Sequence, residues 1–122
     1  WTLPVLLGTV SGSATLANAG NGYAAIDIEI TGPGEGFTIL NQTTGILFKV
    51  DGLTLIAGQK IQITGDDLTV TQSGVSIFQF VTSESQFITL APGNNNLALY
   101  VDSGATSDTQ AVITWYNTYV GI

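Results

Sequence analysis

Apolar and polar residues alternate along most of this chain with a period of about two residues, rather than the roughly 3.6 of a helix. In residues 25–30 (AIDIEI), the three isoleucines fall on one side, and Asp27 and Glu29 fall on the other. Successive side chains of a strand point to opposite faces, so this pattern predicts strands with one buried and one exposed face. The same alternation recurs in residues 46–51, 60–64, 67–71, 97–102 and 111–116.

Turn-forming sequences rich in Gly, Asn, Asp and Pro separate these segments. They lie at residues 43–45, 57–59, 64–67, 72–74, 91–96 and 102–108. Roughly nine or ten short antiparallel strands follow from this spacing, and a single sheet would leave half of their apolar positions in water. The sequence therefore predicts an all-β protein, a β-sandwich formed by residues 1–122 as one domain. Within it, residues 1–15 are expected to form either an N-terminal arm or an edge strand.

Composition narrows the possible partners. Lys49 and Lys60 are the two cations against nine carboxylates, and the net charge is −7. Such a chain is a poor ligand for nucleic acid or for anionic membranes, and no apolar run approaches the ~20 residues of a membrane helix. Cysteine is absent, which excludes disulfides and thiolate metal sites. Methionine is also absent and residue 1 is Trp, so we expect a processed product or a piece of a longer protein.

The stretch ITGPGEGF, residues 30–37, places glycines at alternate positions after a predicted strand. A phosphate-binding loop would need a helix behind it, and here FTIL predicts another strand. Glu35 would also repel a phosphate. We therefore expect a type II turn with Pro33 at its second position and Gly34 at its third. The expected turn residues are Gly32, Pro33, Gly34, Pro92 and Gly93.

The candidates for catalysis are few. Without His or Cys, the chain lacks a Ser–His–Asp triad and a cysteine nucleophile, and Lys49 and Lys60 are expected on solvated strand faces. Asp27 and Glu29 share one strand face about 7 Å apart, a spacing that a glycosidase pair could use, but a polar outer face is the simpler explanation of them. Asp66 and Asp67 alone are a poor calcium site. We expect no cofactor and no metal.

Aromatic residues offer a binding alternative. Alternation places Tyr100 on an outer face together with Asp102, whereas Trp115 is expected in the core. If Tyr100 and Tyr116 lie close together on one sheet, they could form a platform for a sugar ring or a protein-contact patch.

The ordered series of turns and strands resembles the C-terminal domain of the distal tail proteins of siphophages. The resemblance lies in LANAGNGYAAIDIEITGPGEGFTILNQTTG (16–45), LTLIAGQKIQITGDDLTVTQSG (53–74), SESQFITLAPGNNNLALYVDSG (83–104) and VITWY (112–116). The chain departs from the family pattern at Gln59, where Asp is common, and at Tyr116, where Arg is common. The ring-building N-terminal domain of that family is not among these residues.

The resemblance implies a galectin-like, jelly-roll sandwich in the tail of a virion, an extracellular location. Its implied partners are other tail or baseplate proteins, host cell-wall polysaccharide and further copies of the chain in a symmetric homo-oligomer. Two hypotheses stand beside each other: a structural docking domain, and a carbohydrate-binding module that uses Tyr100, Tyr116 and Asp102. A glycan-cleaving enzyme that uses Asp27 and Glu29 is a remote third.

Overall fold

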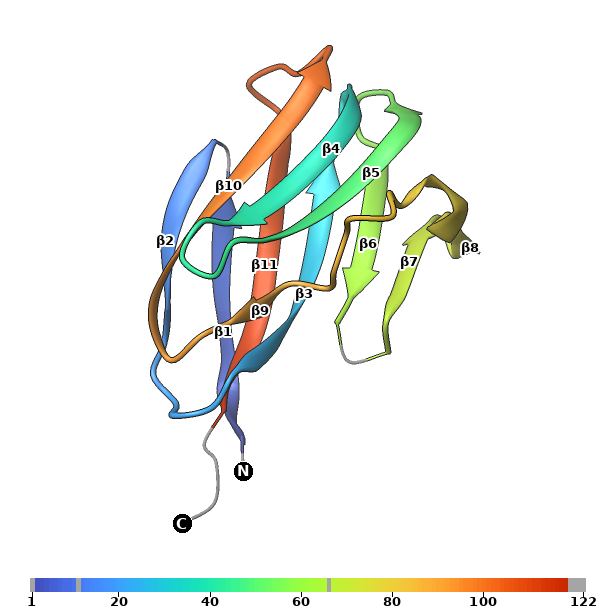
Figure 1. The fold of residues 1–122 in the computed structure, drawn as a ribbon. Helices are drawn as coiled ribbons and strands as arrows, with labels where there is room; N and C mark the ends of the chain where they lie inside the picture. The colour runs from blue at the N-terminus through green and yellow to red at the C-terminus, as the bar shows by residue number, and fades with distance from the viewer. Residues whose placement is uncertain (1, 11, 66, 119–122) are drawn as a thin grey trace.

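Two antiparallel sheets pack face to face in this chain (Figure 1). The computed structural model describes the backbone of residues 2–10, 12–65 and 67–118, and the side chains of residues 12–65 and 67–115. These residues form eleven strands and one short 3₁₀ helix, against the nine or ten strands predicted. The prediction of an all-β, antiparallel sandwich is confirmed.

The larger sheet has seven strands, in the order β1-β11-β3-β6-β7-β8, with the short β9 pairing to β3. Two of its inner strands, β3 and β6, carry the alternating isoleucines, whose side chains point into the core. The strands are β1 (Thr2–Val10), β3 (Ala24–Thr31), β6 (Lys60–Thr64), β7 (Thr69–Gln72), β8 (Val75–Ser76), β9 (Thr89–Leu90) and β11 (Gln110–Thr118).

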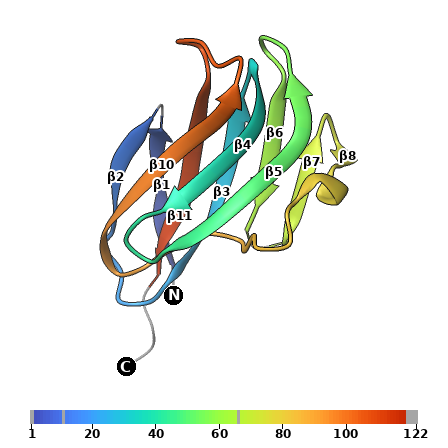
Figure 2. The same ribbon diagram turned by 45° about the horizontal axis from the view of Figure 1, so that its top comes forward.

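The smaller sheet has four strands in the order β2-β10-β4-β5, which lie in front in the tilted view of Figure 2. β4 and β5 are consecutive in the chain, but the other neighbours in this sheet are distant in sequence, because β10 returns from the far end of the chain to lie between β2 and β4. The strands are β2 (Ser13–Asn18), β4 (Gly34–Asn41), β5 (Ile46–Leu55) and β10 (Gly93–Ser103).

The core is the layer between the two inner faces. Ile26, Ile28 and Ile30 of β3 are at most 2% exposed, as the alternation predicts. Opposite them, the smaller sheet contributes Phe37 and Phe48, both buried. Burial of such side chains is the main favourable term in folding, at about 1.5–3 kcal/mol for each large side chain.

One side of the sandwich is closed by the segment that joins β8 to β10. It begins with η1 (Phe78–Phe80) and then runs along β5, where Thr82 N–H donates to Lys49 O at 3.1 Å and Gln86 N–H donates to Leu47 O at 2.9 Å. It then crosses to the other side of the molecule and forms β9 on the way (Figure 1). Because its backbone bonds the outer edge of β5, that edge is not open to another strand.

Three buried asparagines hold the end of this segment. Asn41 donates from Nδ2 to Thr89 O at 2.9 Å, and Asn95 donates to Ala91 O at 2.8 Å. Asn18 donates to Leu90 O at 3.1 Å. All three asparagines are at most 1% exposed and lie on the inner face of the smaller sheet. They satisfy backbone carbonyls that would otherwise be buried without partners, and so they tie the smaller sheet to β9 of the larger one.

The corner between β3 and β4 lies where the sequence predicts it, but the expected type II turn is wrong. The Gly32–Pro33 peptide bond is cis, and Gly34 has a φ of +155°, far from the roughly +80° of a type II turn. Gly34 is already the first residue of β4, paired with Leu55. Strand pairing therefore extends into the corner and leaves only Gly32 and Pro33 to make it.

The predicted turn at residues 91–96 is shorter than expected. Gly93 has a φ of +91°, as a turn glycine would, but β10 already begins there and includes Asn94 to Asn96. The sequence APGNNN suggested a loop because asparagine favours turns. The burial of Asn95 and its bonds to Ala91 and Gly93 stabilise a strand there instead.

Gly36 makes room for a neighbouring side chain. It lies opposite Asp102 of β10, and its φ is +71°, a left-handed conformation that favours glycine. A Cβ at position 36 would lie 2.8 Å from Cγ of Asp102. The absence of a side chain at Gly36 therefore lets the Asp102 carboxylate rest on β4.

Replacement of Asn95 by alanine should destabilise the fold by about 3 kcal/mol, because it removes a buried amide and leaves partly buried backbone groups at Ala91 and Gly93 without partners. Chemical denaturation measures this change in the free energy of unfolding. The exposed neighbour Asn96 is the matched control, and Asn96→Ala should cost less than about 0.5 kcal/mol. Equal costs for the two variants would show that the network of buried asparagines does not stabilise the fold.

Gly36→Ala should cost about 2–3 kcal/mol, of which about half is the left-handed backbone and the rest displacement of Asp102. In an Asp102→Ala background most of the second part disappears, since only Cβ of residue 102 stays close, at 3.1 Å, so a double-mutant cycle on unfolding free energies should show coupling of about 1 kcal/mol. Gly45 is the control, since it has a φ of +79° and nothing within 4 Å of a Cβ there. Asp102→Ala should leave the cost of Gly45→Ala unchanged, and no coupling at Gly36 would contradict this account.

Candidate functional site

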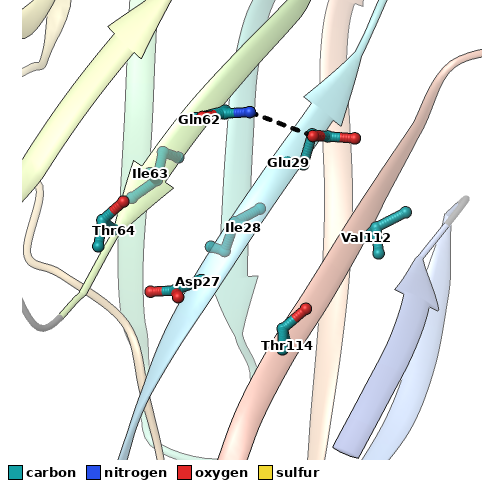
Figure 3. Close-up of a pocket in the computed structure, with 8 residues that line it drawn as sticks. All are labelled: Asp27, Ile28, Glu29, Gln62, Ile63, Thr64, Val112 and Thr114. Atoms are coloured by element: carbon teal, nitrogen blue, oxygen red, sulfur yellow. Dashed lines mark hydrogen bonds between the residues drawn. The ribbon is translucent and has the colours of Figure 1, made fainter. Parts of the chain in front are cut away.

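The outer face of the larger sheet carries a shallow polar depression of about 250 Å³ (Figure 3). Its floor is the middle of β3, flanked by β6 and β11, and its polar side chains come from alternate positions that face away from the core. The residues that line it are Asp27, Ile28, Glu29, Gln62, Ile63, Thr64, Val112 and Thr114.

Asp27 and Glu29, the pair considered for glycan cleavage, both lie in this depression. Each carboxylate already has partners. Asp27 Oδ1 accepts a bond from Gly65 N–H at 3.2 Å, while Glu29 accepts from Lys60 Nζ at 3.1 Å and from Gln62 Nε2 at 3.3 Å. These contacts are those of a hydrogen-bonded outer face, which was the simpler interpretation of the pair.

Lys60 also borders a neighbouring depression of about 320 Å³ between the β5–β6 and β7–β8 turns. Its side chain is 51% exposed and pairs with Glu29, so it is solvated as the alternation predicts. Asp67, of the pair considered for calcium, is exposed in the β6–β7 turn, whereas Asp66 lies outside the described residues. In the described part of the chain, no group of three or more His, Cys, Asp or Glu gathers to hold a metal ion.

The outer face of the smaller sheet presents Tyr100, which is 49% exposed. It lies in a row across three strands with Thr38 of β4 and Lys49 of β5. Its hydroxyl accepts a bond from Gln42 Nε2 at 3.3 Å. Gln42 follows β4 four residues beyond Thr38, so this bond draws the hydroxyl toward the end of β4. Ala98, two residues before Tyr100 on β10, is only 2% exposed.

Asp102 lies two residues further along the same face of β10. Its carboxylate is 3.8 Å from Lys49 Nζ, with the two side chains 52% and 29% exposed. An exposed ion pair of this length contributes little to stability. The pair matters instead for binding. Together with Gln42 it surrounds Tyr100 with an amide, a cation and a carboxylate, all of which can form hydrogen bonds with a ligand.

Tyr116, the second tyrosine of the proposed platform, belongs to β11 of the larger sheet. Tyr100 belongs to β10 of the smaller sheet, so the two do not share a sheet as the platform required. The side chain of Tyr116 lies outside the described residues. The periodicity could not reveal this separation, because consecutive strands of a sandwich can pair within one sheet or cross to the other.

A third surface was missed by the sequence reasoning. The loops that end β3, β5 and β10 meet at one end of the sandwich around a depression of about 410 Å³. Thr109 Oγ1 donates to Pro33 O at 2.6 Å, and Gly32 N–H donates to Gln59 O at 2.9 Å, so the loops are tied together. Ile56 is 65% exposed at its rim. The sequence did contain a sign of this surface in the adjacent Leu55 and Ile56. Only one of two consecutive strand residues can face the core, so the other apolar side chain had to be exposed.

Within the described residues, no helix is both long and apolar enough to cross a membrane.

Comparison with known proteins identifies the family. No curated protein matches the chain. Among solved structures, the crystal structure of SPP1 Dit (gp 19.1), a paradigm of the hub adsorption apparatus in phages that infect Gram-positive bacteria, superposes with a TM-score of 0.70 at 15% sequence identity. The match covers 93% of this chain and 46% of that one, so this chain spans less than half the length of SPP1 Dit.

A family model for the siphovirus-type tail component, C-terminal domain, matches residues 21–119. The match covers most of the chain and agrees with the structural similarity in fold. The chain therefore belongs to the siphovirus-type tail component family and is a component of the virion tail.

Proposed function

We propose that this domain is a non-enzymatic docking domain of the tail, which binds other tail or baseplate proteins through the outer face of the smaller sheet. The observation that carries the proposal is Tyr100. It is a half-exposed aromatic side chain on an open sheet face, beside the polar side chains of Gln42, Lys49 and Asp102.

The chemistry of this face suits a protein partner. Tyrosine is enriched at protein interfaces, because its ring buries a large apolar area while its hydroxyl keeps a hydrogen bond. The hydroxyl of Tyr100 already has a partner in Gln42, which restricts the ring before another protein covers it and so lowers the side-chain entropy lost on binding. The similarity to SPP1 Dit, a hub protein, supports a role in joining parts of the tail.

Recognition of host cell-surface glycans is the second candidate, and the same tyrosine favours it. A half-exposed tyrosine ring can stack on a sugar ring, and Asp102 and Lys49 offer hydrogen bonds to hydroxyl groups. This form of the site uses Tyr100 and Asp102 without Tyr116.

Tyr100→Ala should weaken binding to the tail-protein partner at least tenfold, about 1.4 kcal/mol, because an exposed aromatic anchor is removed. Biolayer interferometry against each of the other tail proteins of the same phage measures this. Tyr23, which is 63% exposed in the β2–β3 loop, is the matched control. Tyr23→Ala should leave the dissociation constant unchanged.

The same two variants separate the candidates. Titration with cell-wall polysaccharide of the host should give no Tyr100-dependent signal if the face binds protein. If glycan binding is lost in Tyr100→Ala and kept in Tyr23→Ala, the face recognises glycans and the docking proposal is wrong. Partner binding that survives Tyr100→Ala would refute the proposed face.

A further inference from the structure

The two sheets have four edge strands, and three of them carry at least partial protection against pairing with another chain. β1 contains Pro4 and a register shift between Thr2 and Val5, before it pairs regularly from Val5 to Val10, while β8 is only two residues long. The third, β5, is covered by residues 81–86. Proline, irregular pairing, shortness and a covering segment are the usual ways in which proteins protect sheet edges.

The fourth edge, β2, has none of these protections. It is six residues long (SATLAN), with no charge, no proline and a continuous register to β10 from Ser13 to Asn18. Ser13, Thr15 and Ala17 are exposed. A regular, uncharged, exposed edge strand is a ready template for the addition of another strand.

The backbone of β2 shows which groups are free. Leu99 N–H donates to Gly12 O, so the backbone N–H and C=O groups of the odd-numbered residues of β10 point toward β2. Gln42 N–H donates to Asn96 O, so the backbone groups of the even-numbered residues point toward β4. The odd-numbered residues of β10 pair with Ala14, Leu16 and Asn18. The backbone groups of Ser13, Thr15 and Ala17 therefore point away from the sheet.

One of these groups is already used, and this confirms their direction. Trp115 Nε1–H, from the larger sheet, donates to Ala17 O at 3.3 Å. In the described part of the chain, no other backbone hydrogen bond reaches this side of residues 13–17. Three N–H groups and two C=O groups thus form an open ladder.

Charge distribution indicates what can pair with this ladder. Residues 1–26, 85–101 and 109–122 contain no charged side chain, so all of β1, β2, β9 and β11 is neutral. On the sheet of β2, the nearest carboxylate along β10 is Asp102, four residues beyond the partner of Ser13 and so about 14 Å away. That is beyond the Debye length of about 8 Å at physiological salt. A second copy can approach this side of a chain with a net charge of −7 without bringing carboxylates together.

We propose that β2 pairs antiparallel with β2 of a second copy of this chain, and that the two four-stranded sheets become one continuous sheet. Thr15 lies opposite Thr15 of the second copy, because this register places Ser13 opposite Ala17 and uses every free group on both strands. Ser13 N–H then donates to Ala17 O of the other copy, a carbonyl with two lone pairs that also accepts from Trp115. The inference goes beyond the proposed docking face, since it uses no side chain near Tyr100.

Sedimentation equilibrium of the 122-residue chain tests the pairing. We expect a reversible dimer at concentrations up to about 1 mM, with Thr15→Pro and Thr15→Lys each raising its dissociation constant at least tenfold. Proline removes a donor that points away from β10, so the fold should persist, and circular dichroism checks this. If Thr15→Pro nevertheless unfolds, Thr15→Lys decides. Tyr100→Ala should leave the dimer intact, so failure of the docking proposal and failure of this one are distinguishable.

Cross-linking tests the register. The chain has no cysteine, so Thr15→Cys places one thiol opposite its copy, at a Cα separation of about 5.5 Å that a disulfide spans. Oxidation should give a disulfide-linked dimer at least tenfold faster than for Thr69→Cys, an exposed threonine on β7. A monomer at all concentrations, a dimer unaffected by both substitutions at Thr15, or equal cross-linking rates at the two sites would overturn the proposal.

Discussion

The sandwich depends on burying the segment between β8 and β10 without leaving its backbone polar groups unpaired. This segment closes one side of the molecule and contributes Ile77, Ile88 and Leu90 to the core, yet only β9 within it pairs regularly with a sheet. An unpaired buried carbonyl costs about 1–3 kcal/mol, so each one needs a partner. Three buried asparagines supply these partners, and no buried side-chain polar atom among the described residues lacks one.

This arrangement determines which surfaces remain for contact. The inner faces are filled, the β5 side is covered, and the depressions among the described residues are shallow and lie on outer faces or at loop ends. Open faces and edges of this kind suit extended contacts with other macromolecules better than the enclosure of a small molecule. A component of a virion tail needs such contacts, and Tyr100 and β2 are two separate places at which the fold offers them.

The two places also differ in physical character. Contact through Tyr100 would depend on one side chain whose hydroxyl bonds Gln42, so its specificity would come from shape and hydrogen bonding at one point. Pairing through β2 would depend on backbone groups, with side chains that are small and uncharged. The first is sensitive to a single truncation, whereas the second tolerates side-chain changes and is blocked by proline or charge.

The sequence by itself determined most of the longer strands, the inner face of β3, the burial of Trp115 and the exposure of Tyr100, because alternation is a local property of a strand. It also located the corner at Gly32 and Pro33, since few other residues turn a chain so sharply. Only the tertiary structure decided that β10 and β11 lie in different sheets, which separates Tyr100 from Tyr116, and that Asn95 belongs to a strand. Sheet membership and the partners of a buried amide depend on residues far away in the chain, and a local pattern contains no information about them.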